Sequence, residues 1–112
     1  MITSANSLTN HWKPLCPMNL SDEQLTQIEE MAAALLPPHE IAILLGIDAG
    51  LRDLFVDVCR NHKSNPVYLA YHQGRLKTKF ELRQTVIRLA KAGSPAAEPL
   101  ADAYIKEQLI NE

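Results

Sequence analysis

The stretch P-H-E-I-A-I-L-L-G-I-D-A-G-L-R-D-L-F-V-D-V-C-R, residues 38–60, decides the fold of this chain. It sets a small residue, Ala42, four positions before Gly46, and the apolar Ile47 follows the glycine. In a helix-turn-helix, a small side chain lies where the two helices cross and a glycine makes the turn. The apolar residue after the glycine then fills the core. This stretch therefore predicts two helices joined by a tight turn.

The second helix of this pair departs from the common DNA-binding pattern. Apolar Leu51 comes one position early, where that pattern would tolerate Arg52, so the turn is shortened or the helix is rotated. Asp48, Asp53 and Asp57 also belong to this segment, and carboxylates repel the phosphates that flank any base. Two readings stay open: the helix contacts bases, with Arg52 as the residue we expect to do so, or it serves only for packing.

Capping signals divide the surrounding chain into helices. Ser21 can cap a first helix, with Gln24 completing a capping box. Pro37-Pro38 ends that helix and starts the next, and Asp48 can cap the third. The expected apolar face of the first helix consists of Leu25, Ile28, Ala32 and Leu35.

A fourth, long helix is predicted from Pro66 to Ala92, after a loop at 61–65. Its apolar residues form two stripes, so it has two surfaces to bury, and one is a candidate subunit interface. Gly74 interrupts it and marks either a bend or a close backbone contact. The short turn at 92–95 predicts an antiparallel hairpin with a fifth helix. The two stripes are Leu69, Leu76, Phe80, Ile87 and Ala90, and Tyr68, Tyr71, Leu82, Val86 and Leu89.

The expected fold is therefore all-α, in three parts. Residues 1–19 lack periodicity and form a flexible N-terminal arm, which orders only if Trp12, Leu15 or Met18 docks. Residues 20–65 form the helix-turn-helix domain. Residues 66–112 form the helical hairpin, a candidate oligomerisation region.

Charge is segregated along the chain, although the net charge is only −2. Residues 20–59 hold eight acids and one base, residues 60–93 hold eight bases and one acid, and residues 94–112 carry a net charge of −3. Such asymmetry favours head-to-tail self-association or an anionic partner for the middle segment, or acidic helices that fold back on the basic one. Because phosphate attracts clustered cations, we expect DNA contacts from Arg52, Arg60, Lys63, Arg75, Lys77, Lys79 and Arg83.

Other classes of function find little support. The paired carboxylates lie on amphipathic helices, and the four glycines do not form a phosphate-cradling loop, so we expect no enzyme and no cofactor. Cys59 and His62 with His11 and Cys16 could supply four zinc ligands, but their spacing is irregular, and a buried thiol at Cys59 is the simpler interpretation. No apolar run spans a membrane, and two cysteines give no disulfide framework, so a cytoplasmic protein is expected.

Several of these stretches together resemble phage terminase small subunits and related prophage DNA-packaging proteins. They are E-I-A-I-L-L-G-I-D (40–48), A-Y-H-Q-G-R (70–75), Leu82-Arg83 with Val86, and L-A-K-A-G-S-P-A-A (89–97). The resemblance covers about residues 21–109. Pro37 stands where the pattern often has a capping Ser or Thr, and the acidic recognition helix is a second departure.

The resemblance implies a non-enzymatic adaptor that recognises viral double-stranded DNA and assembles into a homo-oligomeric ring. Such an adaptor regulates a separate large terminase subunit, which has the ATPase and the nuclease. Two alternatives remain: a small helix-turn-helix transcriptional regulator, and a helical protein-interaction module whose acidic face docks on a basic partner.

Overall fold

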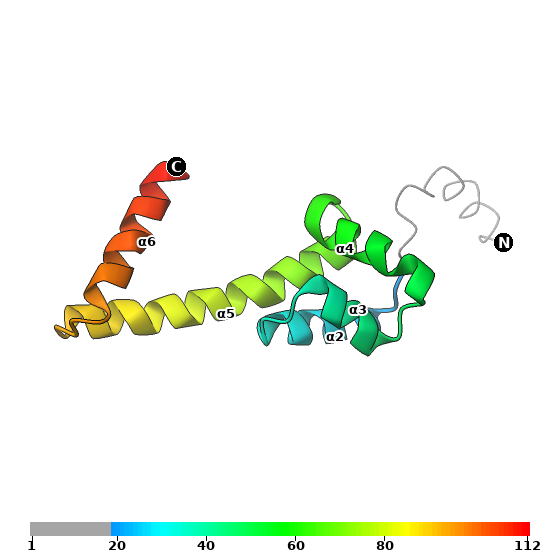
Figure 1. Ribbon diagram of the computed structural model, residues 1–112, viewed down its shortest axis with the longest axis horizontal. Helices are drawn as coiled ribbons and strands as arrows, with labels where there is room; N and C mark the ends of the chain where they lie inside the picture. The colour runs from blue at the N-terminus through cyan, green and yellow to red at the C-terminus, as the bar shows by residue number, and fades with distance from the viewer. Residues whose placement is uncertain (1–18) are drawn as a thin grey trace. The chain divides into compact units, whose positions relative to one another are not determined.

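The computed structural model describes residues 19–112, and this part of the chain is all-α, as predicted. The chain forms two compact units that meet between Arg75 and Leu76. The described part of the first unit begins at Asn19, and the second unit runs from Leu76 to Glu112. None of the described helices is both long and apolar enough to cross a membrane. The elements are α2 (Asp22–Ala33), α3 (Pro38–Leu45), the 3-10 helix η1 (Ala49–Leu51), α4 (Arg52–Asn61), α5 (Pro66–Lys91) and α6 (Glu98–Ile110) (Figure 1).

Helix α2 begins at the predicted capping box. The N–H of Gln24 donates to the Oγ of Ser21 at 3.1 Å, and the N–H of Ser21 donates to the Oε1 of Gln24 at 2.9 Å. These two bonds satisfy backbone donors that the first turn of a helix leaves open. Ile28 and Ala32 on the predicted apolar face are fully buried.

The expected position of Leu35 on that apolar face is wrong. Leu35 has a φ of 66°, and the N–H groups of Leu35 and Leu36 donate to the carbonyls of Ala32 (2.8 Å) and Met31 (3.2 Å). This is the left-handed ending of the Schellman type, which turns Leu35 outward to 51% exposure while Leu36 packs against the core. The Pro37-Pro38 pair forces the chain to leave the helix early, because a residue before proline avoids helical geometry.

Helix α3 and the turn after it follow the sequence closely. Gly46 ends α3 with a φ of 77°, and the N–H of Ile47 donates to the carbonyl of Ala42 at 3.0 Å. Asp48 accepts from the N–H of Gly50 at 3.4 Å, but what it caps is the 3-10 helix η1 rather than an α-helix. Leu51 therefore lies on the 3-10 turn and is 47% exposed.

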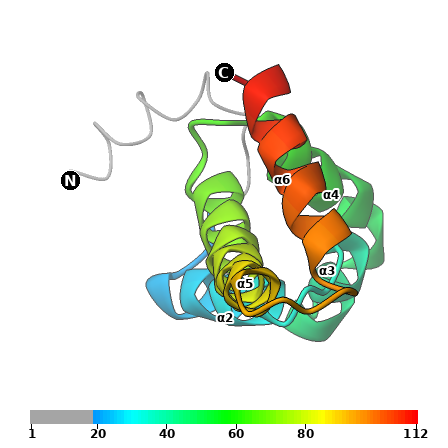
Figure 2. The ribbon, with the colours of Figure 1, turned by 90° about the vertical axis from the view of Figure 1, so that its left-hand side faces the viewer.

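The first unit has one core, built by α2, α3, α4 and the first turns of α5. Gly74 of α5 lies so close to α2 that a Cβ there would collide with the carbonyl oxygen of Glu29 and lie 3.0 Å from the Cβ of Ala32. The glycine thus marks a close backbone contact, one of the two predicted possibilities, and α2 runs beside this part of α5 (Figure 2). The buried hydrophobic residues of this core are Ile28, Ala32, Ile41, Ala42, Phe55, Val58, Cys59, Val67 and Ala70.

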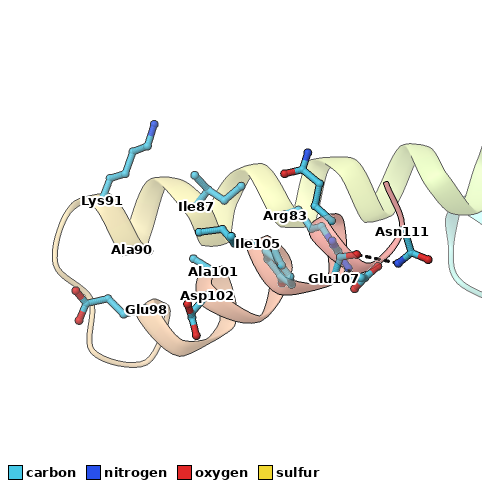
Figure 3. A pocket seen from close by; sticks show the side chains of 12 residues that line it. Arg83, Ile87, Ala90, Lys91, Glu98, Ala101, Asp102, Ile105, Glu107 and Asn111 are labelled. Carbon is cyan, nitrogen blue, oxygen red and sulfur yellow. Dashed lines mark hydrogen bonds and ion pairs between the residues drawn. The ribbon is translucent and has the colours of Figure 1, made fainter.

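The second unit is the α5–α6 hairpin. Gly93 ends the α5 segment with a φ of 91°, and the N–H of Ser94 donates back to the carbonyl of Leu89 at 3.0 Å. Ser94 accepts from the N–H of Ala97 at 3.4 Å, and a turn precedes α6, which begins at Glu98. Helix α6 then turns back toward α5, and Arg83 of α5 reaches Glu107 of α6 (Figure 3).

Candidate nucleic-acid interface

Arg52, the residue expected to contact a base, is the first residue of α4. Its Nε donates to the carbonyl oxygen of Ile47 at 3.1 Å, and the side chain is half-buried. The guanidinium therefore fastens the turn between α3 and α4. A base contact by Arg52 would have to use its terminal nitrogens or break this bond.

The three aspartates of this segment differ in their surroundings. Asp48 caps η1, while Asp53 and Asp57 are exposed on α4. Asp57 accepts a hydrogen bond from the Nδ2 of Asn61 at 2.7 Å and pairs with the Nε2 of His62 at 2.8 Å. The hydrogen bonds from Asn61 and His62 hold the pKa of Asp57 below its usual range. Asp57 thus keeps its negative charge at neutral pH.

Cations gather at the carboxyl end of α4. Arg60 lies in the last turn and Lys63 in the loop that follows, and both are exposed. The carboxyl end of a helix carries partial negative charge, so cations are stabilised there. Among the described residues, no carboxylate lies within ion-pair distance of either side chain.

Arg75 joins the same end of α4 through His72. The Nη2 of Arg75 lies 3.4 Å from the Nδ1 of His72, and the Nε2 of His72 lies 3.0 Å from the carbonyl oxygen of Cys59. One tautomer serves both contacts, with Nε2–H donating to the carbonyl and Nδ1 accepting from the arginine. The ring of Tyr68 stacks against His72 at a centroid distance of 4.1 Å, which limits the imidazole's rotation.

We call Arg60, Lys63 and Arg75 the α4-end cluster. All three belong to the first unit, and the α4-end cluster is made by two helices and a loop that share one core. Lys77 is exposed on the opposite side of α5 from Arg75, because two residues turn a helix by about 200°.

The remaining predicted cations, Lys79 and Arg83, face α6. The Nη2 of Arg83 donates to the Oε1 of Glu107 at 2.8 Å, and its guanidinium lies 4.1 Å from the ring centroid of Tyr104. The Nζ of Lys79 lies 3.6 Å from the other carboxylate oxygen. The hydrogen bond and charge of Arg83 lower the pKa of Glu107. A phosphate could reach these two cations only by competing with Glu107.

The predicted set is therefore divided. Arg60 and Lys63 lie at the carboxyl end of α4, to which His72 links Arg75. Lys79 and Arg83 are paired with a carboxylate, and Arg52 closes a turn. Sequence reasoning missed His72 and Glu107. The three-residue spacing of His72 and Arg75 on a helix could have indicated the first contact. No local signal indicates Glu107, which is far from Arg83 along the chain.

The structure bears on metal and thiol chemistry at Cys59 and His62. Within residues 19–112 no three metal-ligating side chains cluster, and His11 and Cys16 lie outside the described residues. Cys59 is a fully buried thiol, as expected, and burial raises its pKa to about 12.

Comparisons with protein-family models, with curated proteins and with solved structures find no match to this chain.

Proposed function

We propose that this chain is a non-enzymatic DNA-binding adaptor of the terminase small-subunit type. In this proposal α3, η1 and α4 act as a helix-turn-helix, and the α4-end cluster grips the phosphates of double-stranded DNA. The adaptor would present viral DNA to a separate large terminase subunit. The observation that supports the proposal is that Arg60 and Lys63 lie at the carboxyl end of α4, where His72 links Arg75 to the carbonyl of Cys59.

Physical chemistry supports phosphate as the ligand of the α4-end cluster. Arginine recognises phosphate with paired donors, and lysine adds a mobile point charge. The contact with His72 restrains the guanidinium of Arg75, which reduces the conformational entropy lost when that guanidinium binds a phosphate. The acidic face of α4 works against close contact, so the helix would approach DNA by its carboxyl end, where Arg60 and Lys63 lie.

Two exposed lysines offer a matched test. Lys63→Gln removes one cation from the α4-end cluster, whereas Lys106→Gln removes one from α6, where Lys106 pairs with Asp102 at 3.1 Å. With a fluorescent DNA duplex at low salt, Lys63→Gln should weaken binding whatever the duplex sequence, and Lys106→Gln should not. Equal effects of the two substitutions, or none from Lys63→Gln, would refute the α4-end cluster as the contact.

A second candidate function is a protein-interaction module. The observation that favours it is the exposure of Ile43, Leu44 and Leu51 on α3 and η1, in the same unit as the acidic α4. A unit that exposes both large apolar side chains and aspartates suits a basic amphipathic partner. Absence of any DNA binding in the lysine experiment would favour this function over the first.

A further inference from the structure

A groove of about 310 Å³ opens on the first unit beside the turn between α3 and η1. Ile47, Leu51 and Leu54 supply its apolar surface, and Leu51 is 47% exposed. A Cβ on Gly46, which also lines the groove, would have no neighbour within 4 Å, so the space above the turn is open. The volume lies at the lower end of the roughly 300–1,000 Å³ of ligand pockets, so the groove can hold a few side chains but not a folded domain.

The groove lies where the described part of the chain begins. Asn19 and Leu20 line it, so the segment before them joins the described part at the edge of the groove. Residues 1–18 lie outside the described part, and the chain from Trp12 to Asn19 spans at most about 25 Å when it is extended. A segment tethered so closely meets the groove at a roughly millimolar effective concentration, so even a weak contact is occupied.

The segment before Asn19 has apolar residues at a regular spacing. Trp12, Leu15 and Met18 are three residues apart, and Pro14 and Pro17 stand between them. Proline favours the polyproline II conformation, which has three residues per turn. Residues spaced by three lie on one face of that conformation. The spacing therefore predicts that the large apolar side chains of residues 12–18 face the same way.

We propose that residues 12–18 of the same chain occupy this groove in extended form, with Trp12, Leu15 and Met18 turned toward it. Charge supports this occupant, because residues 1–18 have one base, Lys13, and no acid, whereas residues 20–59 hold eight acids and one base. Asp48 lines the groove and is exposed, so it attracts a cationic segment. The docked segment would cover the apolar groove and would compete with any other basic partner for this surface.

Tryptophan fluorescence of the full chain tests the docking. Trp12 is the one tryptophan of the chain, so its emission reports on this segment alone. Without denaturant the emission should lie at shorter wavelength, and acrylamide should quench it less, than for the chain unfolded in urea. Dilution should leave this shielding unchanged, because the groove belongs to the same molecule. Equal quenching with and without urea, or shielding that is lost on dilution because a second copy supplies the groove, would overturn the proposal.

Two exposed leucines of the first unit offer a matched pair of variants. Leu51→Gln removes an apolar contact from the groove, whereas Leu44→Gln changes a 65% exposed residue of α3 that does not line it. With wild-type helix content, Leu51→Gln alone should increase the quenching and shift the emission to longer wavelength. The contact can also be removed from the other side, without any change to the described helices. Leu15→Gln with Met18→Gln should increase the quenching, and Ile2→Gln with Leu8→Gln is the control.

A third pair tests the charge. Asp48→Asn removes the carboxylate from the groove but keeps a side chain that can cap η1, because asparagine is also a good helix cap. It should weaken the shielding of Trp12, whereas Asp53→Asn, at an exposed position of α4 outside the groove, should not. Equal effects within any of the three pairs would refute the groove as the docking site. No DNA enters the assay, so its result is independent of the proposed function.

Discussion

Gly74→Ala distinguishes helix propensity from packing, because the two predict opposite signs. In an isolated helix, replacing glycine by alanine stabilises by about 1 kcal/mol. Here the new Cβ would collide with the backbone carbonyl of Glu29 and lie 3.0 Å from the Cβ of Ala32. Both neighbours belong to α2, so relief requires α2 to move off the core.

Overpacking of this kind costs about 1–3 kcal/mol, and more where backbone is the obstacle. After the propensity gain is subtracted, we expect Gly74→Ala to lower the free energy of unfolding by about 1 kcal/mol or more. Urea denaturation of the full chain, followed by circular dichroism, measures this. Gly50→Ala is the matched control, because its Cβ would meet only the Oδ2 of Asp48 at 3.5 Å. A more stable Gly74→Ala variant would refute the close contact between α2 and α5.

Three further predictions follow from single contacts. Leu35→Gly should stabilise the chain by about 1 kcal/mol in the same assay, because glycine adopts a φ of 66° without the strain that leucine has there; a destabilised variant would contradict this. The Cys59 thiol, with its pKa raised to about 12 by burial, should resist alkylation at pH 8 until the chain unfolds, as peptide mass spectrometry can show. The lowered pKa of Glu107 means that its ion pair stabilises the hairpin above the unfolded pKa of a glutamate, and that this contribution is lost as pH falls through the folded pKa. Arg83→Gln should return the pKa of Glu107 toward its usual range in an NMR titration, and an unchanged pKa would contradict the assigned cause.

Local signals in the sequence predicted the helices and most of their ends. The capping box at Ser21, the left-handed Gly46 and the start of α5 at Pro66 all lie where side-chain and backbone chemistry within a few residues requires them. The prediction for Leu35 was wrong. Helical spacing placed its side chain in the core, but the helix ends early, before Pro37-Pro38.

The candidate interface could be predicted only in part, because some of its cations contact residues that are distant in the sequence. The sequence predicted one phosphate-binding surface along the basic segment. In the structure Glu107 forms ion pairs with Lys79 and Arg83, and the carbonyl of Ile47 accepts a hydrogen bond from Arg52. Helical geometry could have shown that Arg75 and Lys77 lie on opposite sides of α5. Only the fold shows that His72 links Arg75 to the end of α4.

The salt dependence of DNA binding tests the proposed function most directly. Each phosphate contact contributes about −0.9 to the slope of log K against log salt concentration. The three cations of the α4-end cluster therefore predict a slope of about −2.7 or steeper for the wild type. The variant Arg60→Gln, Lys63→Gln, Arg75→Gln should lose about that much of the slope, while keeping the wild-type circular dichroism spectrum. No DNA binding by the wild type, or the same slope in the variant, would contradict the account.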